Sequence, residues 1–144
     1  MDIVFPINNI EIILKCIPQR NPIVMVDTLI SYSENVITAG LTINETSIFT
    51  NEKQLNESGL IEHMAQTVAL HTGFSFFMKK EAAPTGYIGS ISKLVIKKLP
   101  KAKEVLITTA TILHDFAGIT LVEIVSKIND EIIAEGQMKT VIAK

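Results

Sequence analysis

The 144-residue sequence contains a single cysteine, Cys16, and this scarcity excludes two kinds of site. One cysteine cannot form an internal disulfide. It does not make a metal cluster with three scattered histidines either, because a zinc ion needs ligands that converge. We therefore expect no metal site, and we expect a reducing, cytoplasmic setting.

Charged residues are also few, at 19% of the chain, and the net charge is −2. The chain lacks the basic balance with which proteins neutralise phosphates, so a nucleic-acid partner is not expected. Lysines gather only in KKLPKAK, at residues 97–103. This cluster fits a solvated turn, and the alternative is a docking patch for an acidic partner.

Three longer patterns are missing as well. The longest apolar runs fall short of the roughly 20 residues that cross a bilayer, and residues 1–9 carry Asp2 but no lysine or arginine to begin a secretory signal. The chain has no G-x-S-x-G elbow and no glycine-rich phosphate loop. We therefore expect no membrane span, no signal peptide and no serine-hydrolase triad.

Apolar residues, in contrast, make up 47% of the chain, and their patterns predict one domain, residues 1–144. Asn8 or Asn9 can cap a first helix, which Pro18 ends. The expected elements of residues 10–55 are a short helix at 10–17, a hairpin of strands at 23–33 and 36–43, and a polar loop at 44–55. The one long helical candidate follows at residues 56–80, with Asn56 as its cap.

After this helix the hydrophobic period changes from 3.6 to 2, which indicates strands. The four strand-like segments lie at residues 87–98, 104–114, 119–128 and 131–143. Turn-forming residues separate them, and we interpret them as a four-stranded meander. The last segment has one polar face and one face expected to be buried, the latter comprising Ile132, Ala134, Gly136, Met138, Thr140 and Ile142. Such alternation is typical of an antiparallel sheet.

The order of elements predicts an α+β fold in which a curved antiparallel sheet wraps around one long apolar helix. A single helix cannot cover both sides of a six-stranded sheet. We therefore expect an exposed edge strand to pair with a second copy, which gives a dimer.

Glu62 is the only acidic residue of the long helix beyond its first turn. Its helical face is small and then hydrophobic, with Ser58, Ala65, Gln66, Ala69, Gly73 and Phe76 at steps of three and four. One interpretation is a general acid or base in an apolar site. The other is a helix carboxylate that points to solvent.

None of the three histidines is expected to share the helical face of Glu62. His63 lies about 100° around the helix from Glu62, and His71 lies about 180° away, in the core or facing solvent. His114 ends a strand before a turn, where exposure is expected. Gly89, inside a strand, indicates either a bulge or a close approach of backbone or ligand.

The segments PQRNPIVMVD, GLIEHMAQTVALHTG and YIGSISKLVIKKL occur in this order around the hairpin and the long helix. Together they resemble the 3-hydroxyacyl-[acyl carrier protein] dehydratases of hot-dog fold, over residues 17–143. The branch that the chain is similar to contains the predicted dehydratases of aryl polyene or flexirubin-type pathways, which share a [VI]-E-x-M-A-Q helix.

This resemblance implies a dimeric hot-dog protein whose substrate is carried on the phosphopantetheine of acyl carrier protein, with no other cofactor. Glu62 matches the carboxylate that helps protonate the departing 3-hydroxyl. The family's histidine, which removes the C2 proton, comes from the other subunit in a G-H-F-P-type loop. The corresponding segment here, IFTNEKQLNES at residues 48–58, has no histidine. His63, or a histidine-containing homologue in a mixed dimer, would then supply the base.

The resemblance also implies residues that hold the substrate. Backbone N–H groups near Ser58 and Gly59 would polarise the thioester carbonyl. Gln66 belongs to the helix motif, and Gly89 matches a strand glycine that lies along the pantetheine path, with Ser90 beside it.

Three hypotheses follow for the function. The first is a dehydratase of 3-hydroxyacyl-carrier-protein thioesters, or one subunit of it, with Glu62 as the acid and an apolar groove beside the helix for the acyl chain. The second is an acyl thioesterase in which the carboxylate activates water. The third is a non-catalytic acyl-binding subunit.

Overall fold

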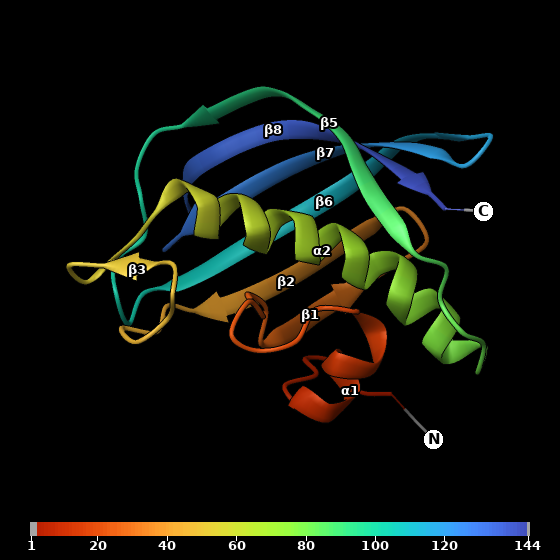
Figure 1. Cartoon of the computed structure of the whole chain (residues 1–144), viewed down its shortest axis with the longest axis horizontal. Coiled ribbons are helices and arrows are strands. Elements are labelled where there is room, and N and C mark those ends of the chain that lie inside the picture. Colours follow the sequence, from red (N-terminus) through yellow and green to blue (C-terminus); the bar gives the residue numbers. More distant parts are fainter. Residues whose placement is uncertain (1–2, 144) are drawn as a thin grey trace.

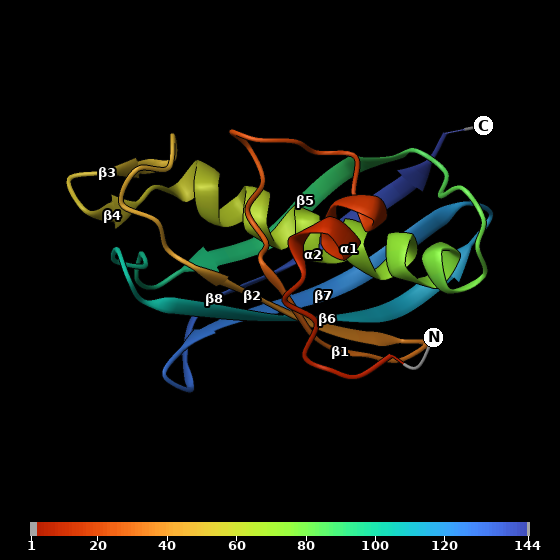
Figure 2. The same ribbon diagram turned by 90° about the horizontal axis from the view of Figure 1, so that it is seen from below.

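A single long helix, α2 (Glu57–Met78), lies along the concave side of a curved antiparallel sheet (Figures 1 and 2). The structure is a computed structural model and describes residues 3–143. Asn56 caps the helix, because its side chain accepts a hydrogen bond from the N–H of Gly59 at 2.8 Å. Glu57 in the first turn faces the positive end of the helix dipole. The predicted helix and its predicted cap are therefore confirmed.

The remaining elements form a second, short helix, the main sheet and a small hairpin. They are α1 (Ile10–Cys16), β1 (Thr28–Tyr32), β2 (Val36–Thr42), β3 (Thr50–Asn51), β4 (Gln54–Leu55), β5 (Gly86–Ile96), β6 (Val105–Phe116), β7 (Ile119–Ile128) and β8 (Glu131–Ile142). The six-stranded sheet has the order β1-β2-β6-β7-β8-β5, and β3 pairs only with β4. This arrangement is the hot-dog fold that the sequence predicted.

The predicted four-stranded meander is wrong in one connection. β6, β7 and β8 follow one another as neighbours, but β5 pairs with β8, and β6 pairs with β2 instead. The tight turns at Ala117-Gly118 and Asn129-Asp130, where φ is positive, can join only adjacent strands. The longer connection at residues 97–104 instead carries the chain past the start of α2, where Pro100 O accepts from Leu55 N. The alternation of apolar and polar side chains predicts where the strands lie, but it cannot show which strands pair.

Three local predictions also need correction. The first strand begins at Thr28, later than the predicted residue 23, and the predicted polar loop contains the β3–β4 hairpin. In β8, Ile132 is exposed, whereas Ile133 is fully buried. The register shifts opposite Ser126 and Lys127, so one extra residue changes which side chains face the core.

Helix α1 packs against the C-terminal half of α2 at a very close approach. A Cβ atom added to Gly73 would lie 1.6 Å from the carbonyl oxygen of Cys16, so only glycine fits at this crossing. The contact fixes the end of α1, and with it the residues that follow, beside one face of α2.

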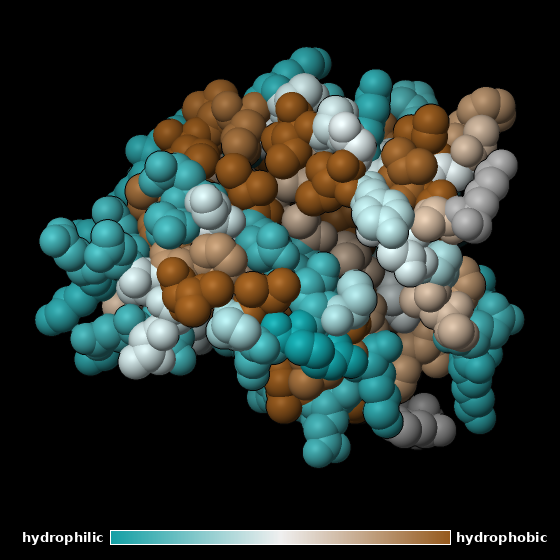
Figure 3. Space-filling model, viewed as in Figure 1, coloured by the Kyte–Doolittle hydropathy of each residue, from teal (hydrophilic) through white to brown (hydrophobic). Residues whose placement is uncertain are grey.

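The two edges of the sheet differ. Ile7 bridges to Leu29 and so covers part of the β1 edge. β5 pairs with β8 on one side, and no described strand pairs with its other side. Large apolar side chains of β5 are exposed, namely Tyr87, Ile88, Ile91 and Val95. Figure 3 shows apolar surface along the upper side of the molecule, where β5 and β8 lie in Figure 1.

Within residues 3–143, no helix combines the length and the apolar character that crossing a membrane requires.

Candidate active site

A cavity of about 330 Å³ lies beside Glu62, against the face of α2 that carries small residues. Ala65, Ala69 and Gly73 form the helix wall, as their spacing from Glu62 predicted. The opposite walls come from the end of α1, the start of β5 and the end of β8, and include Pro18, Gln19, Tyr87, Ile88, Thr140 and Ile142. These walls could not be predicted, because they are far from α2 in the sequence.

The carboxylate of Glu62 is half-buried and is held by a neighbour one helical turn away. The side-chain N–H of Gln66 donates to Glu62 Oε1 at 2.8 Å. One oxygen of the carboxylate is therefore fixed by an amide, while the residue itself lines the cavity. A carboxyl group in this position can exchange a proton with a molecule in the cavity.

Gln66 is fully buried, and its three partners determine how its amide is turned. Its Nε2 donates both to Glu62 and to the carbonyl oxygen of Ile23, at 2.7 Å. Its Oε1 accepts from the N–H of Met25 at 2.6 Å. A flipped amide would set oxygen against two acceptors and NH₂ against a donor, so only this orientation satisfies all three groups.

His63 points away from the cavity and into the core, where it is fully buried. Its Nδ1 lies 2.7 Å from the carbonyl oxygen of Met25, and its Nε2 lies 2.8 Å from the hydroxyl of Thr108. Burial lowers the pKa of His63 to about 4, and the hydrogen bond to Met25 and the charge of Asp27 oppose this effect only in part. The imidazole is thus neutral at pH 7, and both ring nitrogens are occupied.

The other proposed substrate contacts are scattered around the site. Ser58 is exposed at the start of α2, whereas Gly59 is buried against Phe49 and Leu55, and its N–H is already taken by the Asn56 cap. Gly89 and Ser90 lie exposed on β5. The register of β5 shifts between Ile88 and Ser90, so the bulge interpretation of Gly89 is confirmed. Of the residues proposed from the sequence, the structure brings only Glu62 and Gln66 into contact.

Two polar residues at the end of α1 were not singled out from the sequence as lining a site. Gln19 lines the cavity, and its Oε1 is buried with no hydrogen-bond partner among the described residues. Cys16 lines the same cavity, and burial raises the pKa of its thiol to about 11. Because the thiol stays protonated at pH 7, Cys16 is not a nucleophile here.

A second cavity, of about 390 Å³, adjoins the first beneath the C-terminal half of α2. The two share Val68, Thr72, Thr120, Thr140 and Ile142 as walls. His71 lines the far part, where its Nε2 lies 2.9 Å from Ser33 O and its ring stacks on Tyr32. Together the cavities form an elongated space from Glu62 along the helix, which suits an extended chain.

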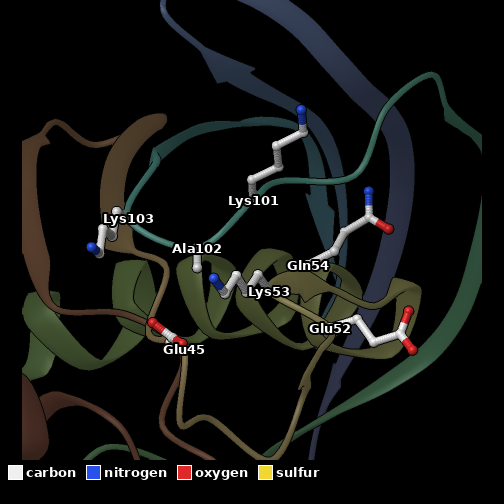
Figure 4. Close-up of a pocket in the computed structure, with 7 residues that line it drawn as sticks. All are labelled: Glu45, Glu52, Lys53, Gln54, Lys101, Ala102 and Lys103. Atoms are coloured by element: carbon white, nitrogen blue, oxygen red, sulfur yellow. The ribbon is translucent and has the colours of Figure 1, made fainter.

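Lys101 and Lys103 of the lysine cluster lie elsewhere, in a shallow charged depression beside the β3–β4 hairpin (Figure 4). Lys101 bridges to Gln54 through the backbone, and Figure 4 shows Lys101 and Glu52 pointing away from each other. Glutamates are mixed with the lysines in this depression, and the side chains do not converge. Residues 3–143 also hold no group of three or more His, Cys, Asp or Glu side chains that could bind a metal ion.

Comparison with protein families gives a match over nearly the whole chain. Residues 12–144 match the ApeP-like family, described as ApeP dehydratase. The chain is also 28% identical over 137 residues to the 3-hydroxyacyl-[acyl-carrier-protein] dehydratase FabZ of Caldicellulosiruptor bescii, which covers 90% of this chain and 95% of that protein.

Solved structures share the fold. The dehydratase heterocomplex ApeI:P from Xenorhabdus doucetiae contains a chain with a TM-score of 0.84 and 20% identity, covering 92% of this chain and 91% of that one. A sigma28-regulated virulence protein from Campylobacter jejuni gives a TM-score of 0.73 at 14% identity, with 95% and 91% covered. At these identities the structures are evidence for the fold alone.

Proposed function

Because the chain belongs to the ApeP-like dehydratase family, we propose that it provides the acid, Glu62, of a dehydratase that acts on 3-hydroxyacyl thioesters of acyl carrier protein. The observation that carries the proposal is the position of Glu62. Among the described residues that line the 330 Å³ cavity, it is the one carboxylate, and Gln66 holds it from the helix side. The cavity along Ala65, Ala69 and Gly73 of α2 would receive the acyl chain.

The proposed reaction is an elimination of water across C2 and C3 of the acyl group. A base takes the C2 proton, the C3–O bond breaks, and the protonated carboxyl of Glu62 gives its proton to the departing hydroxyl, which leaves as water. The product is a 2-enoyl thioester. In the reverse direction Glu62 takes a proton from the attacking water, so hydration of the enoyl thioester reports on the same site.

We propose that the base comes from a different chain. The neutral ring of His63 has both nitrogens bonded in the core and does not line the cavity. The segment at residues 48–58 has no histidine. The similar chain from Xenorhabdus doucetiae belongs to a heterocomplex, which supports a mixed dimer with a histidine-containing homologue. In that assembly the exposed Ser58, Gly89 and Ser90 would contact the pantetheine arm.

The test uses the purified protein alone and mixed with a histidine-containing homologue, with 3-hydroxyacyl- and 2-enoyl-carrier-protein as substrates. We expect water loss and addition in the mixture. Glu62→Gln, which keeps the size and the hydrogen-bonding capacity of the side chain but cannot exchange the proton, should abolish turnover that depends on this chain. Glu57→Gln, on the exposed first turn of the same helix, is the matched control and should keep full activity.

Each alternative gives a different result in the same assay. Release of free acid would show a thioesterase. Absence of turnover in every mixture would favour the non-catalytic acyl-binding subunit. Unchanged rates in Glu62→Gln, with the fold intact by circular dichroism, would remove Glu62 from the mechanism.

A further inference from the structure

Six residues link the centre of the sheet to Glu62 through hydrogen bonds, and within this chain the C=O and the N–H of Met25 are joined by the backbone. Ser126 on β7 and Thr108 on β6 are paired across the two strands, and their hydroxyl oxygens lie 2.6 Å apart. The chain then passes through His63, the backbone of Met25 and the side chain of Gln66 before it reaches the carboxylate. Ser126, Thr108, His63 and Gln66 are all fully buried.

The direction of each bond in this chain follows from the partners. A carbonyl oxygen can only accept, so His63 Nδ1 carries the proton and donates to Met25 O. His63 Nε2 is then an acceptor, and Thr108 donates to it. Thr108 O accepts in turn from the hydroxyl of Ser126. Each of these buried groups has a partner, and none can reverse without leaving another unsatisfied.

Met25 is the point at which the helix and the preceding chain are joined. Its N–H donates to Gln66 and its C=O accepts from His63, two side chains that lie three positions apart on α2. The segment at Ile23–Met25 has no regular secondary structure and precedes β1, so side chains of the helix take the place of a strand partner. If Met25 moved, its N–H and the nearby carbonyl of Ile23, which together orient the Gln66 amide, would move with it.

We propose that His63 is a positioning residue for Glu62: it holds Met25, Met25 and Ile23 orient Gln66, and Gln66 fixes the carboxylate at the cavity. The step from this arrangement to turnover rests on the proposed function, whereas the arrangement itself can be tested without any substrate. This role differs from that of a base, because His63 contacts neither the cavity nor the reacting atoms.

The test compares His63→Leu, which cannot make either bond, with His63→Gln, whose amide can still donate to Met25 and accept from Thr108. The first readout is hydrogen exchange by NMR at the Met25 N–H and the Gln66 side-chain NH₂. In His63→Leu we expect exchange of these groups to rise at least tenfold, while amides in β7 and β8 keep their protection. His63→Gln should stay near the wild type.

The second readout is turnover in the mixed assembly. His63→Leu should lower kcat by roughly ten- to a hundredfold with KM little changed, because a displaced acid weakens the chemical step more than binding. His63→Gln should restore most of kcat. If His63→Leu does not fold, Thr108→Val replaces it, since this variant removes the hydroxyl that donates to Nε2 at nearly constant volume.

The outcomes separate the two proposals. Unchanged exchange at Met25 and Gln66 in a folded His63→Leu or Thr108→Val protein would overturn the positioning role, and so would equal activity of His63→Leu and the wild type. Faster exchange together with a lower kcat supports it. If the wild-type mixture shows no dehydration at all, the proposed function fails, and the exchange data alone decide whether His63 holds Gln66.

Discussion

Ile48 is a large apolar residue that is 58% exposed, in the segment that leads to α2. When Ser47-Ile48-Phe49-Thr50 is set against the G-H-F-P motif with Phe49 on the phenylalanine, Ile48 stands at the position of the histidine. We therefore predict that Ile48→His gives the protein alone measurable hydration of enoyl-carrier-protein. The measurement is the loss of enoyl absorbance.

Two matched variants make this prediction specific. Ile48→Gln introduces polarity without a base and should remain inactive. Combining Ile48→His with Glu62→Gln should abolish the gained activity, because the new base needs the acid. An inactive Ile48→His protein that still dimerises would contradict the view that only the base is missing.

His63 makes the stability of the fold depend on pH. Its pKa is 6.5 in the unfolded chain and about 4 in the folded protein. Below pH 6.5 the unfolded state therefore binds a proton that the folded state does not, and the free energy of unfolding falls until about pH 4, then levels off. The whole effect is at most roughly 3–4 kcal/mol, since each pH unit between the two pKa values corresponds to about 1.4 kcal/mol.

The measurement is urea unfolding at several pH values between 7 and 4, for the wild type and for His63→Gln. Carboxylates titrate in both proteins, so the difference between the two curves isolates the histidine. We expect the wild type to lose stability faster than His63→Gln as the pH falls. Parallel curves would show that the imidazole is not held neutral in the folded state.

At the scale of single residues, the sequence could predict that Gln66 shares the helical face of Glu62, but not the distant contacts that hold Gln66 and His63. Gln66 and the small residues recur at steps of three and four on one helix, so their common face follows from helix geometry. The contacts of Met25 with Gln66 and His63 join residues 41 and 38 positions apart, and His63 meets Thr108 across 45 positions. No local spacing predicts such contacts, which is why His63 looked like a candidate base.

At the scale of elements, the crossing of α1 and α2 leaves no room for a larger side chain at Gly73. We predict that Gly73→Ala destabilises the protein by about 1–3 kcal/mol or more, because the new methyl group would meet the backbone oxygen of Cys16, which cannot rotate away. This cost exceeds the roughly 1 kcal/mol that alanine gains over glycine in a helix. The urea midpoint at constant slope measures the change.

Ser75→Ala, two positions later on the same helix, is the control for Gly73→Ala. It adds no atom and should change stability by no more than about 0.5 kcal/mol. A stabilised Gly73→Ala protein would show that α1 can move away from α2. Because α1 carries Pro18 and Gln19 to the cavity, such movement should also be visible as altered turnover.

Elements were more predictable than their pairing. The change of period from 3.6 to 2 located α2 and four strands, since each period depends only on neighbouring residues. The pairing of β5 with β8 depends instead on how the chain passes the start of α2, which the sequence of residues 97–104 does not reveal. The exposure of Ile132 follows from a single bulge, which reverses the faces of a strand without changing its composition.

For the whole molecule, the contrast between the two sheet edges indicates where another chain joins. Part of the β1 edge is bridged by Ile7, whereas the outer side of β5 has no described partner. An apolar, unpaired edge strand is a strong template for a further strand. The dimer that the sequence predicted would extend the sheet through β5, and it would set the Glu62 cavity, whose wall includes Tyr87 and Ile88, beside the partner chain.

We predict that Ile91→Lys on β5 abolishes dimer formation, whereas Ile107→Lys on the central strand β6 does not. The two isoleucines form a matched pair, because their side chains are 41% and 38% exposed, so both variants add one charge at similar solvent access. Only Ile91 lies on the unpaired edge strand, where a charge would have to be buried on association. Sedimentation should give the wild type twice the 15.8 kDa chain mass, and Ile91→Lys the single mass.

The same comparison with a histidine-containing homologue tests the mixed dimer, and loss of turnover in parallel with loss of association would tie the active site to this edge. Equal association of both variants would place the interface elsewhere on the molecule.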